Sequence, residues 1–182
     1  DELKSEEFAD LYADNTEGHR DTGSEYVRET YIESDLELMF PPTYIPNDSE
    51  RISLYRELDN MEEERDILAF TERLKDRFGK IPKEGKELIR IVRLRRMAKK
   101  LGMEKVILKK GQMSLFLVNN PDSPYYQSEA FGKLLGFIQK HPRECNLREQ
   151  NGKRSIVIKN VPTVEAACGY LQEMEKINST TF

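Results

Sequence analysis

Residues that often carry chemistry are scarce in this sequence of 182 residues. It has no tryptophan, two cysteines and two histidines. Cys145 and Cys168 form neither a CxxC metal motif nor a disulfide framework, and neither His19 nor His141 has a second ligand at metal-binding spacing. We therefore expect no metal site, and cysteines that stay reduced, as they do in the cytoplasm.

Long apolar runs and catalytic signatures are also missing. No stretch of eighteen apolar residues occurs, and the first residues lack the pattern of a signal peptide, so we expect no contact with a membrane. The sequence contains no phosphate-binding loop, dinucleotide-binding glycine turn, zinc-protease pair or serine nucleophile elbow. Its carboxylates are scattered along helical faces. We expect this chain not to be an enzyme and to bind no cofactor.

Charge is distributed unevenly along the chain. The net charge of -4 combines residues 1–50, with 15 acids and 3 bases, and residues 71–110, with 5 acids and 15 bases. This asymmetry is compatible with docking within the molecule, with an anionic partner or with solvated helical faces. The sequence leaves these three interpretations open.

The N-terminal region has the composition of a linker. Residues 1–32 mix acids with glycine, serine, threonine and asparagine, which predicts a partly disordered tether. The chain begins with Asp1 rather than Met, so we expect a piece of a longer polypeptide. Residues 33–40 place two leucines and a phenylalanine on one side of an extended chain, and two prolines follow. This pattern predicts a short edge strand.

Three amphipathic helices are predicted next, over residues 49–58, 61–78 and 82–101. In the first helix, Ile52 and Tyr55 are expected to face the core. The apolar stripes of the other two are Ile67, Phe70, Leu74 and Phe78, and then Leu88, Ile91, Leu94, Ala98 and Leu101. Short connections between the helices favour a small helical layer over residues 48–102.

The pattern then changes to the period of two that is typical of strands. Residues 105–110 and 113–118 flank Gly111-Gln112, which suits a type II′ hairpin, and residues 146–150 and 155–159 flank Asn151-Gly152. A helix that begins at Ser123-Pro124 follows the first hairpin, and a helix capped by Thr163 follows the second. The fold class is therefore α+β. We expect the helical layer to be followed by a ββαββα antiparallel sheet over residues 104–178, with helices on one face, and a tail over residues 179–182.

Two helical faces are candidate interaction surfaces. The third helix places five cations on one side: Lys86, Arg90, Arg93, Arg96 and Lys100. Such a row could follow a phosphate backbone, yet stacking aromatics are absent from this helix, so a solvated or internally paired face and a protein partner remain alternatives. On the second helix, Arg73, Asp76 and Arg77 lie close together and offer charges of both signs.

Three motifs occur in order along the chain. The stretch Glu37–Arg56 (ELMFPPTYIPNDSERISLYR), the stretch Leu74–Pro82 (LKDRFGKIP) and the stretch Arg93–Met103 (RLRRMAKKLGM) resemble the C-terminal domain of bacterial transcription-repair coupling factors. The resemblance covers about residues 33–175. Arg73 stands where relatives tend to carry Glu, and Glu72 lies next to it.

The resemblance implies a regulatory domain in a bacterial, cytoplasmic protein of transcription-coupled nucleotide-excision repair. Such a parent displaces stalled RNA polymerase by ATP-driven translocation on DNA and recruits UvrA. ATP and Mg would bind its motor domains, outside this chain. The domain would dock on the parent's N-terminal UvrB-like module, hide the UvrA-binding surface and restrain translocation. The contact residues implied are Glu72, Arg73, Asp76 and Arg77.

Two other functions stay open on the sequence alone. The first is a nucleic-acid-binding accessory module that uses the basic helix over residues 86–100, although we expect DNA to be contacted mainly through the parent. The second is a scaffold that completes the fold of the motor without regulating it.

Overall fold

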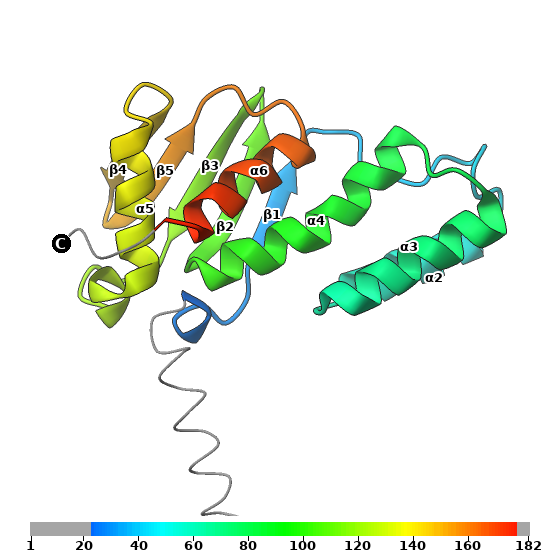
Figure 1. Ribbon diagram of the computed structural model, residues 1–182, viewed down its shortest axis with the longest axis horizontal. Helices are drawn as coiled ribbons and strands as arrows, with labels where there is room; N and C mark the ends of the chain where they lie inside the picture. Colours follow the sequence, from blue (N-terminus) through cyan, green and yellow to red (C-terminus); the bar gives the residue numbers. More distant parts are fainter. Residues whose placement is uncertain (1–22, 178–182) are drawn as a thin grey trace, which may run out of the picture.

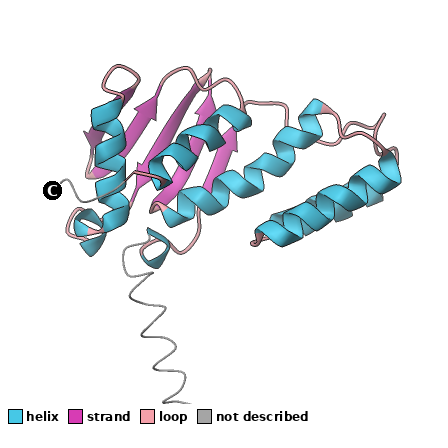
Figure 2. Cartoon of the chain, in the orientation of Figure 1, coloured by secondary structure: helices cyan, strands magenta, loops and turns pink. Residues whose placement is uncertain are grey.

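The computed structural model describes residues 23–177 of the chain. It has an α+β fold with a five-stranded mixed sheet in the order β1-β2-β3-β5-β4. Helices α4, α5 and α6 cover one face of the sheet, and α2 and α3 lie beside the start of α4 (Figures 1 and 2). The elements are η1 (Gly23–Glu25), β1 (Tyr31–Ser34), α2 (Asp48–Asp59), α3 (Glu64–Phe78), α4 (Lys83–Lys100), β2 (Met103–Lys109), β3 (Gln112–Leu117), η2 (Pro124–Gln127), α5 (Glu129–Lys140), β4 (Cys145–Gln150), β5 (Lys153–Ile158) and α6 (Val164–Glu175). The predicted fold class is confirmed.

Both hairpins of the ββαββα unit are present, and both use the same turn. In the β4–β5 turn, Asn151 and Gly152 have φ angles of 55° and 77°, as a type I′ turn requires. In the β2–β3 turn, Lys110 and Gly111 have φ angles of 55° and 71°, and Lys109 pairs with Gln112. The type II′ turn predicted at Gly111-Gln112 is therefore wrong by one residue, because the strands close around Lys110-Gly111.

The predicted edge strand is also displaced. β1 spans Tyr31–Ser34 rather than residues 33–40, and it pairs in parallel with β2 at the edge of the sheet. The ladder ends where the Asp35 N–H donates to the Leu108 carbonyl and the Ser34 hydroxyl accepts from the Leu36 N–H. This bend turns the chain away from the sheet and toward the helices. The three helices between β1 and β2 form the crossover that a parallel pair needs.

Residues 23–32 pack against the fold, so the predicted tether over residues 1–32 is too long. Val27 is buried, and the buried Thr30 hydroxyl donates to the Met103 carbonyl at 2.7 Å. The backbone of Gly23 lies against Gly102 so closely that a side chain would not fit there. The rest of the predicted tether, residues 1–22, and the predicted tail, residues 179–182, lie outside the described residues.

The larger hydrophobic cluster, called the sheet core here, lies between the sheet and the helices that cover it. Tyr125 is fully buried in it and donates a hydrogen bond to the Leu101 carbonyl at 2.6 Å. The helix predicted to open at Ser123-Pro124 is interrupted here. It becomes the 3-10 turn η2, and Ser128 then caps α5 by accepting from the Phe131 N–H.

The smaller cluster, called the helical core here, lies between α2, α3 and the first half of α4. Its centre is Phe40, whose ring stacks on Tyr55 at 5.5 Å and lies 6.4 Å from the ring of Phe70. Tyr55 packs against this core, as predicted, but Ile52, which was also expected to face it, is 50% exposed because α2 turns Leu58 inward. α3 begins at Glu64 rather than at residue 61. A turn precedes it, in which the Met61 N–H donates a hydrogen bond to the Leu58 carbonyl.

Helix α4 belongs to both cores. Ile89 and Val92 are buried in the helical core, whereas Leu94 and Ala98 are buried in the sheet core. The predicted helix is confirmed, but it has two buried sides rather than one. This explains why its arginines are only partly exposed.

Candidate interdomain contact surface

Helix α3 is held firmly on one side and free on the other. Ile67, Phe70 and Leu74 are buried in the helical core. Gly79, with φ at 84°, ends the helix. The Tyr44 hydroxyl lies 2.8 Å from the Gly79 carbonyl oxygen and 3.3 Å from that of Leu74, so it can donate to either group at the helix end. The opposite side of α3 is therefore a fixed platform on the surface.

Two of the four predicted contact residues face α2. Arg73 pairs with Glu57, and Arg77 Nη2 lies 2.6 Å from Glu50 Oε1. The Arg77 guanidinium also lies 5.1 Å from the centre of the Phe78 ring. Both arginine side chains are more than half exposed, so these ion pairs add little stability but fix where the cations sit.

The two predicted acids form no ion pair or hydrogen bond with α2 and are more available. Glu72 has one ion pair, a 3.6 Å contact with Lys75 on the same helix. Asp76 is exposed and has no ion pair or hydrogen bond to any of residues 23–177. One turn before Glu72, the side chain of Leu68 is 53% exposed. We call Leu68, Glu72 and Asp76 the outward α3 surface.

Leu68 was not among the residues predicted from the sequence. The sequence does contain a feature that marks Leu68 as a candidate contact residue. Leu68 is a large apolar residue that falls outside the stripe formed by Ile67, Phe70 and Leu74. An apolar side chain on the charged side of an amphipathic helix is a common feature of contact surfaces, although single exposed leucines are also ordinary.

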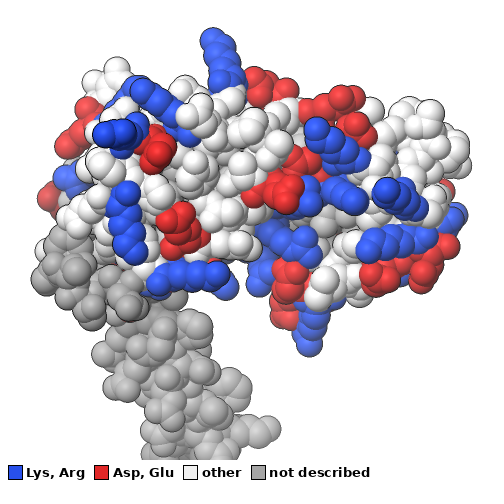
Figure 3. Space-filling model, turned by 45° about the horizontal axis from the view of Figure 1, so that its top comes forward, with Lys and Arg blue, Asp and Glu red and all other residues white. Residues whose placement is uncertain are grey.

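The predicted basic surface on α4 is largely neutralised within the domain. Arg93 and Arg96 both contact the Glu64 carboxylate, at 2.8 Å and 3.3 Å. Arg90 pairs with Glu87 at 3.1 Å. Acidic and basic side chains accordingly alternate over much of the face in Figure 3. Lys86 and Lys100, near the two ends of the helix, are exposed. The structure does not bring the five cations together as one free stripe.

Glu87 has a structural role that the sequence did not reveal. Its carboxylate is buried and accepts hydrogen bonds from the backbone N–H groups of Val164 at 2.9 Å and Glu165 at 3.1 Å. The first amides of a helix have no hydrogen-bond partner within the helix, and the Glu87 carboxylate provides one for these two. Its negative charge also interacts favourably with the dipole of α6. Glu87 therefore fixes the start of α6 against α4.

The cysteines lie in the interior. Burial raises the pKa of the Cys145 thiol and of the Cys168 thiol to about 11 in each case, so both stay protonated at neutral pH. Within residues 23–177, no group of three or more metal-ligating side chains comes together. No helix in the same range is long and apolar enough to cross a membrane.

The five-stranded sheet, the helices on one of its faces and the charged helix α3 beside them define a small α+β domain. The family model of the TRCF domain matches residues 34–128, slightly more than half of the chain. The chain therefore belongs to the TRCF domain family.

Relatives and a solved structure agree with this assignment. The transcription-repair-coupling factor of Escherichia coli is 30% identical over 121 residues, which are 66% of this chain and 10% of that protein. The transcription-repair-coupling factor of Rickettsia prowazekii is 26% identical over 135 residues, which are 72% of this chain and 11% of that protein. The crystal structure of the C-terminal domain of transcription-repair coupling factor has the same fold, with a TM-score of 0.64 and 15% identity. The match covers 85% of this chain and 96% of that chain. The chain spans about a tenth of the length of its curated relatives.

Proposed function

We propose that this chain is a non-catalytic regulatory domain of a transcription-repair coupling factor. In this proposal it docks on the parent's N-terminal UvrB-like module, masks the surface that binds UvrA and restrains ATP-driven translocation on DNA. Membership of the TRCF domain family supports a transcription-repair coupling factor as the parent protein. The match in fold to a C-terminal domain supports a position of this chain at the C-terminal end of that parent.

The observation that carries the docking role is the outward α3 surface. Asp76 is exposed on a helix whose other side is anchored in the helical core, and it forms no ion pair within residues 23–177. Leu68 adds exposed apolar area beside it. Acids next to an apolar side chain suit a partner surface that offers cations around an apolar depression, because charge complementarity gives specificity and apolar burial gives affinity.

Regulation by this contact would be an equilibrium between a docked and an undocked arrangement. Any event that competes for the α3 surface, or for the module that it covers, shifts the population toward the undocked state. An exposed, charged contact is suited to such a switch, since it is weak enough to open and sensitive to salt.

The direct test is binding of this chain to a purified UvrB-like module, measured by calorimetry at low salt. Asp76→Arg should weaken binding at least about tenfold, because it places a cation where the partner is expected to be basic. Asp122→Arg is the matched control, since Asp122 is also exposed but lies in the loop after β3. In a full-length parent, Asp76→Arg should raise both UvrA binding and ATP turnover.

Reversal of Arg77 is less informative than reversal of Asp76, because a negative charge there would also face Glu50 on α2. Equal binding by the wild type and by Asp76→Arg would place the contact elsewhere on the domain. If deletion of the whole domain left UvrA binding and ATP turnover of the parent unchanged, the domain would be a passive scaffold.

A further inference from the structure

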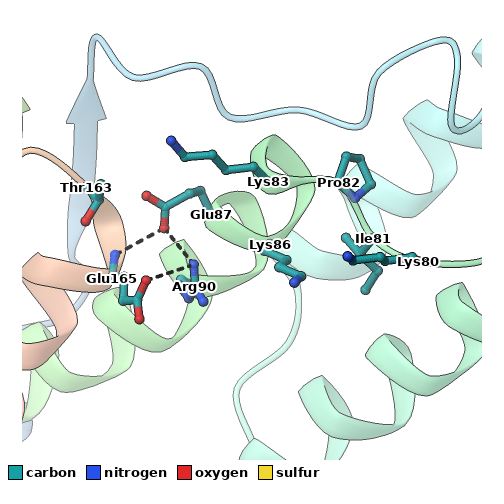
Figure 4. A pocket seen from close by; sticks show the side chains of 9 residues that line it. All are labelled: Lys80, Ile81, Pro82, Lys83, Lys86, Glu87, Arg90, Thr163 and Glu165. Carbon is teal, nitrogen blue, oxygen red and sulfur yellow. Dashed lines mark hydrogen bonds and ion pairs between the residues drawn. The ribbon is translucent and has the colours of Figure 1, made fainter.

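A cleft of about 460 Å³ lies where the starts of α4 and α6 meet. Its wall includes the loop between α3 and α4, the first two turns of α4 and the first turn of α6. The residues that line it are Lys80, Ile81, Pro82, Lys83, Lys86, Glu87, Arg90, Thr163 and Glu165 (Figure 4). The cleft is distinct from the outward α3 surface.

The charged groups at the α6 end of the cleft are already paired with one another. Glu87 caps α6, and Arg90 contacts Glu87 at 3.1 Å and Glu165 at 3.7 Å. Figure 4 shows these three side chains facing one another beside Thr163. The arginine and both carboxylates therefore each have a partner within the domain.

Charges at the α4 end are not neutralised. Lys80, Lys83 and Lys86 form no ion pair with any acid of residues 23–177, and all three are exposed. Pro82 occupies the N-cap position of α4 and provides no side-chain acceptor for the first amides of the helix. With Arg90 included, the cleft has four cations against two carboxylates, so it is an electropositive depression.

We propose that this cleft binds the phosphate groups of a nucleic-acid backbone. The uncompensated cations are all lysines, which act as point charges and contact phosphate oxygens without the fixed, two-pronged geometry with which arginine binds carboxylate and phosphate groups. The apolar lining is limited to Ile81, which is buried, and Pro82, so the cleft offers no pocket for the anchoring side chain of a peptide. Aromatic residues, on which bases could stack, are absent from the lining, and binding is therefore independent of sequence.

The cleft goes beyond the proposed docking function and is independent of it. It also differs from the basic row first considered on α4, since it shares only Lys86 and Arg90 with that row, and Arg90 is already paired. It instead includes Lys80 and Lys83, which the row did not contain. The expected contact is local and weak, because the whole chain has a net charge of -4.

The test is the binding of a fluorescein-labelled 20-base-pair duplex to the full 182-residue chain, followed by anisotropy over a series of salt concentrations. The test variant carries Lys80→Gln, Lys83→Gln and Lys86→Gln. The control variant has the same net charge through Lys140→Gln, Lys153→Gln and Lys176→Gln, three exposed positions outside the cleft. Circular dichroism shows whether both variants are folded.

Three lysine–phosphate contacts predict a slope of about -2.7 for log K against log salt. The test variant should lose about tenfold or more in affinity at low salt and most of this slope, whereas the control variant should resemble the wild type. Inorganic pyrophosphate at millimolar concentration should displace the duplex from the wild type, as expected for a site that recognises phosphate.

Three outcomes would overturn the inference. Equal losses in the two variants would mean a diffuse effect of net charge. No binding of the duplex at low salt, with pyrophosphate bound through the three lysines, would reassign the cleft to a small phosphate compound. Competition by a poly-glutamate peptide at lower concentration than a DNA strand of equal charge would favour an acidic protein segment. None of these results bears on docking through Asp76.

Discussion

In the sheet core, the side chains of Tyr125 and Thr30 are buried with their hydroxyl groups hydrogen-bonded, whereas the side-chain hydrogen bonds around the helical core are partly buried or exposed. Tyr125 and Thr30 each donate to a backbone carbonyl in the interior. Around the helical core, by contrast, Arg73 and Arg77 reach across an exposed face to acids of α2. Buried hydrogen bonds are costly to break, and exposed ion pairs contribute about 1 kcal/mol or less.

This difference suggests which half of the domain is better suited to a reversible contact with a partner. The sheet half and the helical half share α4, so displacement of α2 and α3 would leave the sheet core closed. The outward α3 surface lies on the half whose polar contacts are weaker and sensitive to salt. We infer that the helical half can adjust to a partner while the sheet half holds the fold, and four changes test this comparison.

The largest effect is expected from Gly102→Ala in the sheet half. Gly102 has a φ of 82°, and an added Cβ would lie 2.1 Å from the buried Tyr125 ring. We expect a loss of about 3 kcal/mol in the free energy of unfolding, from strain in the backbone and overpacking together. Urea unfolding followed by circular dichroism measures it.

Gly79→Ala in the helical half is the matched control. Gly79 has almost the same φ, 84°, but no atom lies within 4 Å of an added Cβ. Only the backbone penalty should remain, about 1–2 kcal/mol, because φ 84° with ψ -161° is a combination that is essentially restricted to glycine. Equal losses at the two glycines would show that Tyr125 moves aside, and that the sheet core is less rigid than its packing indicates.

Glu87→Ala should have the second largest effect, because it removes the contact that ties α6 to α4. Two amides of α6 and the Arg90 guanidinium would lose a common partner. The expected loss is about 2 kcal/mol in the free energy of unfolding. Glu84→Ala, one turn earlier on the same helix, should cost far less, since the Glu84 side chain makes no ion pair or hydrogen bond within residues 23–177. A similar loss in both variants would argue against the cap.

His141 should make the sheet half sensitive to pH. Its Nε2 atom lies 2.6 Å from Glu173 and its Nδ1 atom 3.2 Å from Glu144, and the hydrogen bond with Glu173 is the main cause that raises the pKa of His141. The folded protein therefore binds this proton more tightly than the unfolded chain does. The stabilisation is complete below the unfolded pKa of about 6.5 and is lost as pH rises through the folded pKa.

The measurement is unfolding free energy against pH for the wild type and for His141→Gln. The difference between them should shrink by less than about 1 kcal/mol from pH 6 to pH 9, because the site is close to the surface. A difference that stays constant or grows over this range would contradict the role of the two glutamates.

The smallest effect is expected from Glu64→Gln in the helical half. The change releases Arg93 and Arg96 from their shared partner, and we expect a loss of about 0.5 kcal/mol that disappears at high salt. A loss that persists in 1 M salt would mean that these contacts matter more than other exposed pairs, and the contrast between the two halves would then be weaker.

Local features of the fold were predictable because their causes are local. Asn151-Gly152 encodes a tight turn through residues that accept positive φ, and Asn47 and Thr163 cap α2 and α6 with their own side chains. The candidate contact residues were found through a motif, but the sequence could not separate the paired Arg73 and Arg77 from the exposed Asp76. That separation depends on acids of α2 that are 16 and 27 positions away along the chain.

By itself, the sequence determined the helices, the two hairpins, the absence of the common catalytic motifs and the resemblance to one family, since periodicity, turn residues and short motifs act over a few residues. Only the tertiary structure decided that α4 is buried on two sides, that β1 begins at Tyr31 and runs parallel to β2, and that Glu87 caps a helix 77 positions further along the chain. It also decided which cations remain free. Pairing of charges depends on distance in space, and chain folding brings Glu64 to Arg93 and Arg96 while it leaves Lys80, Lys83 and Lys86 without an acid among the described residues.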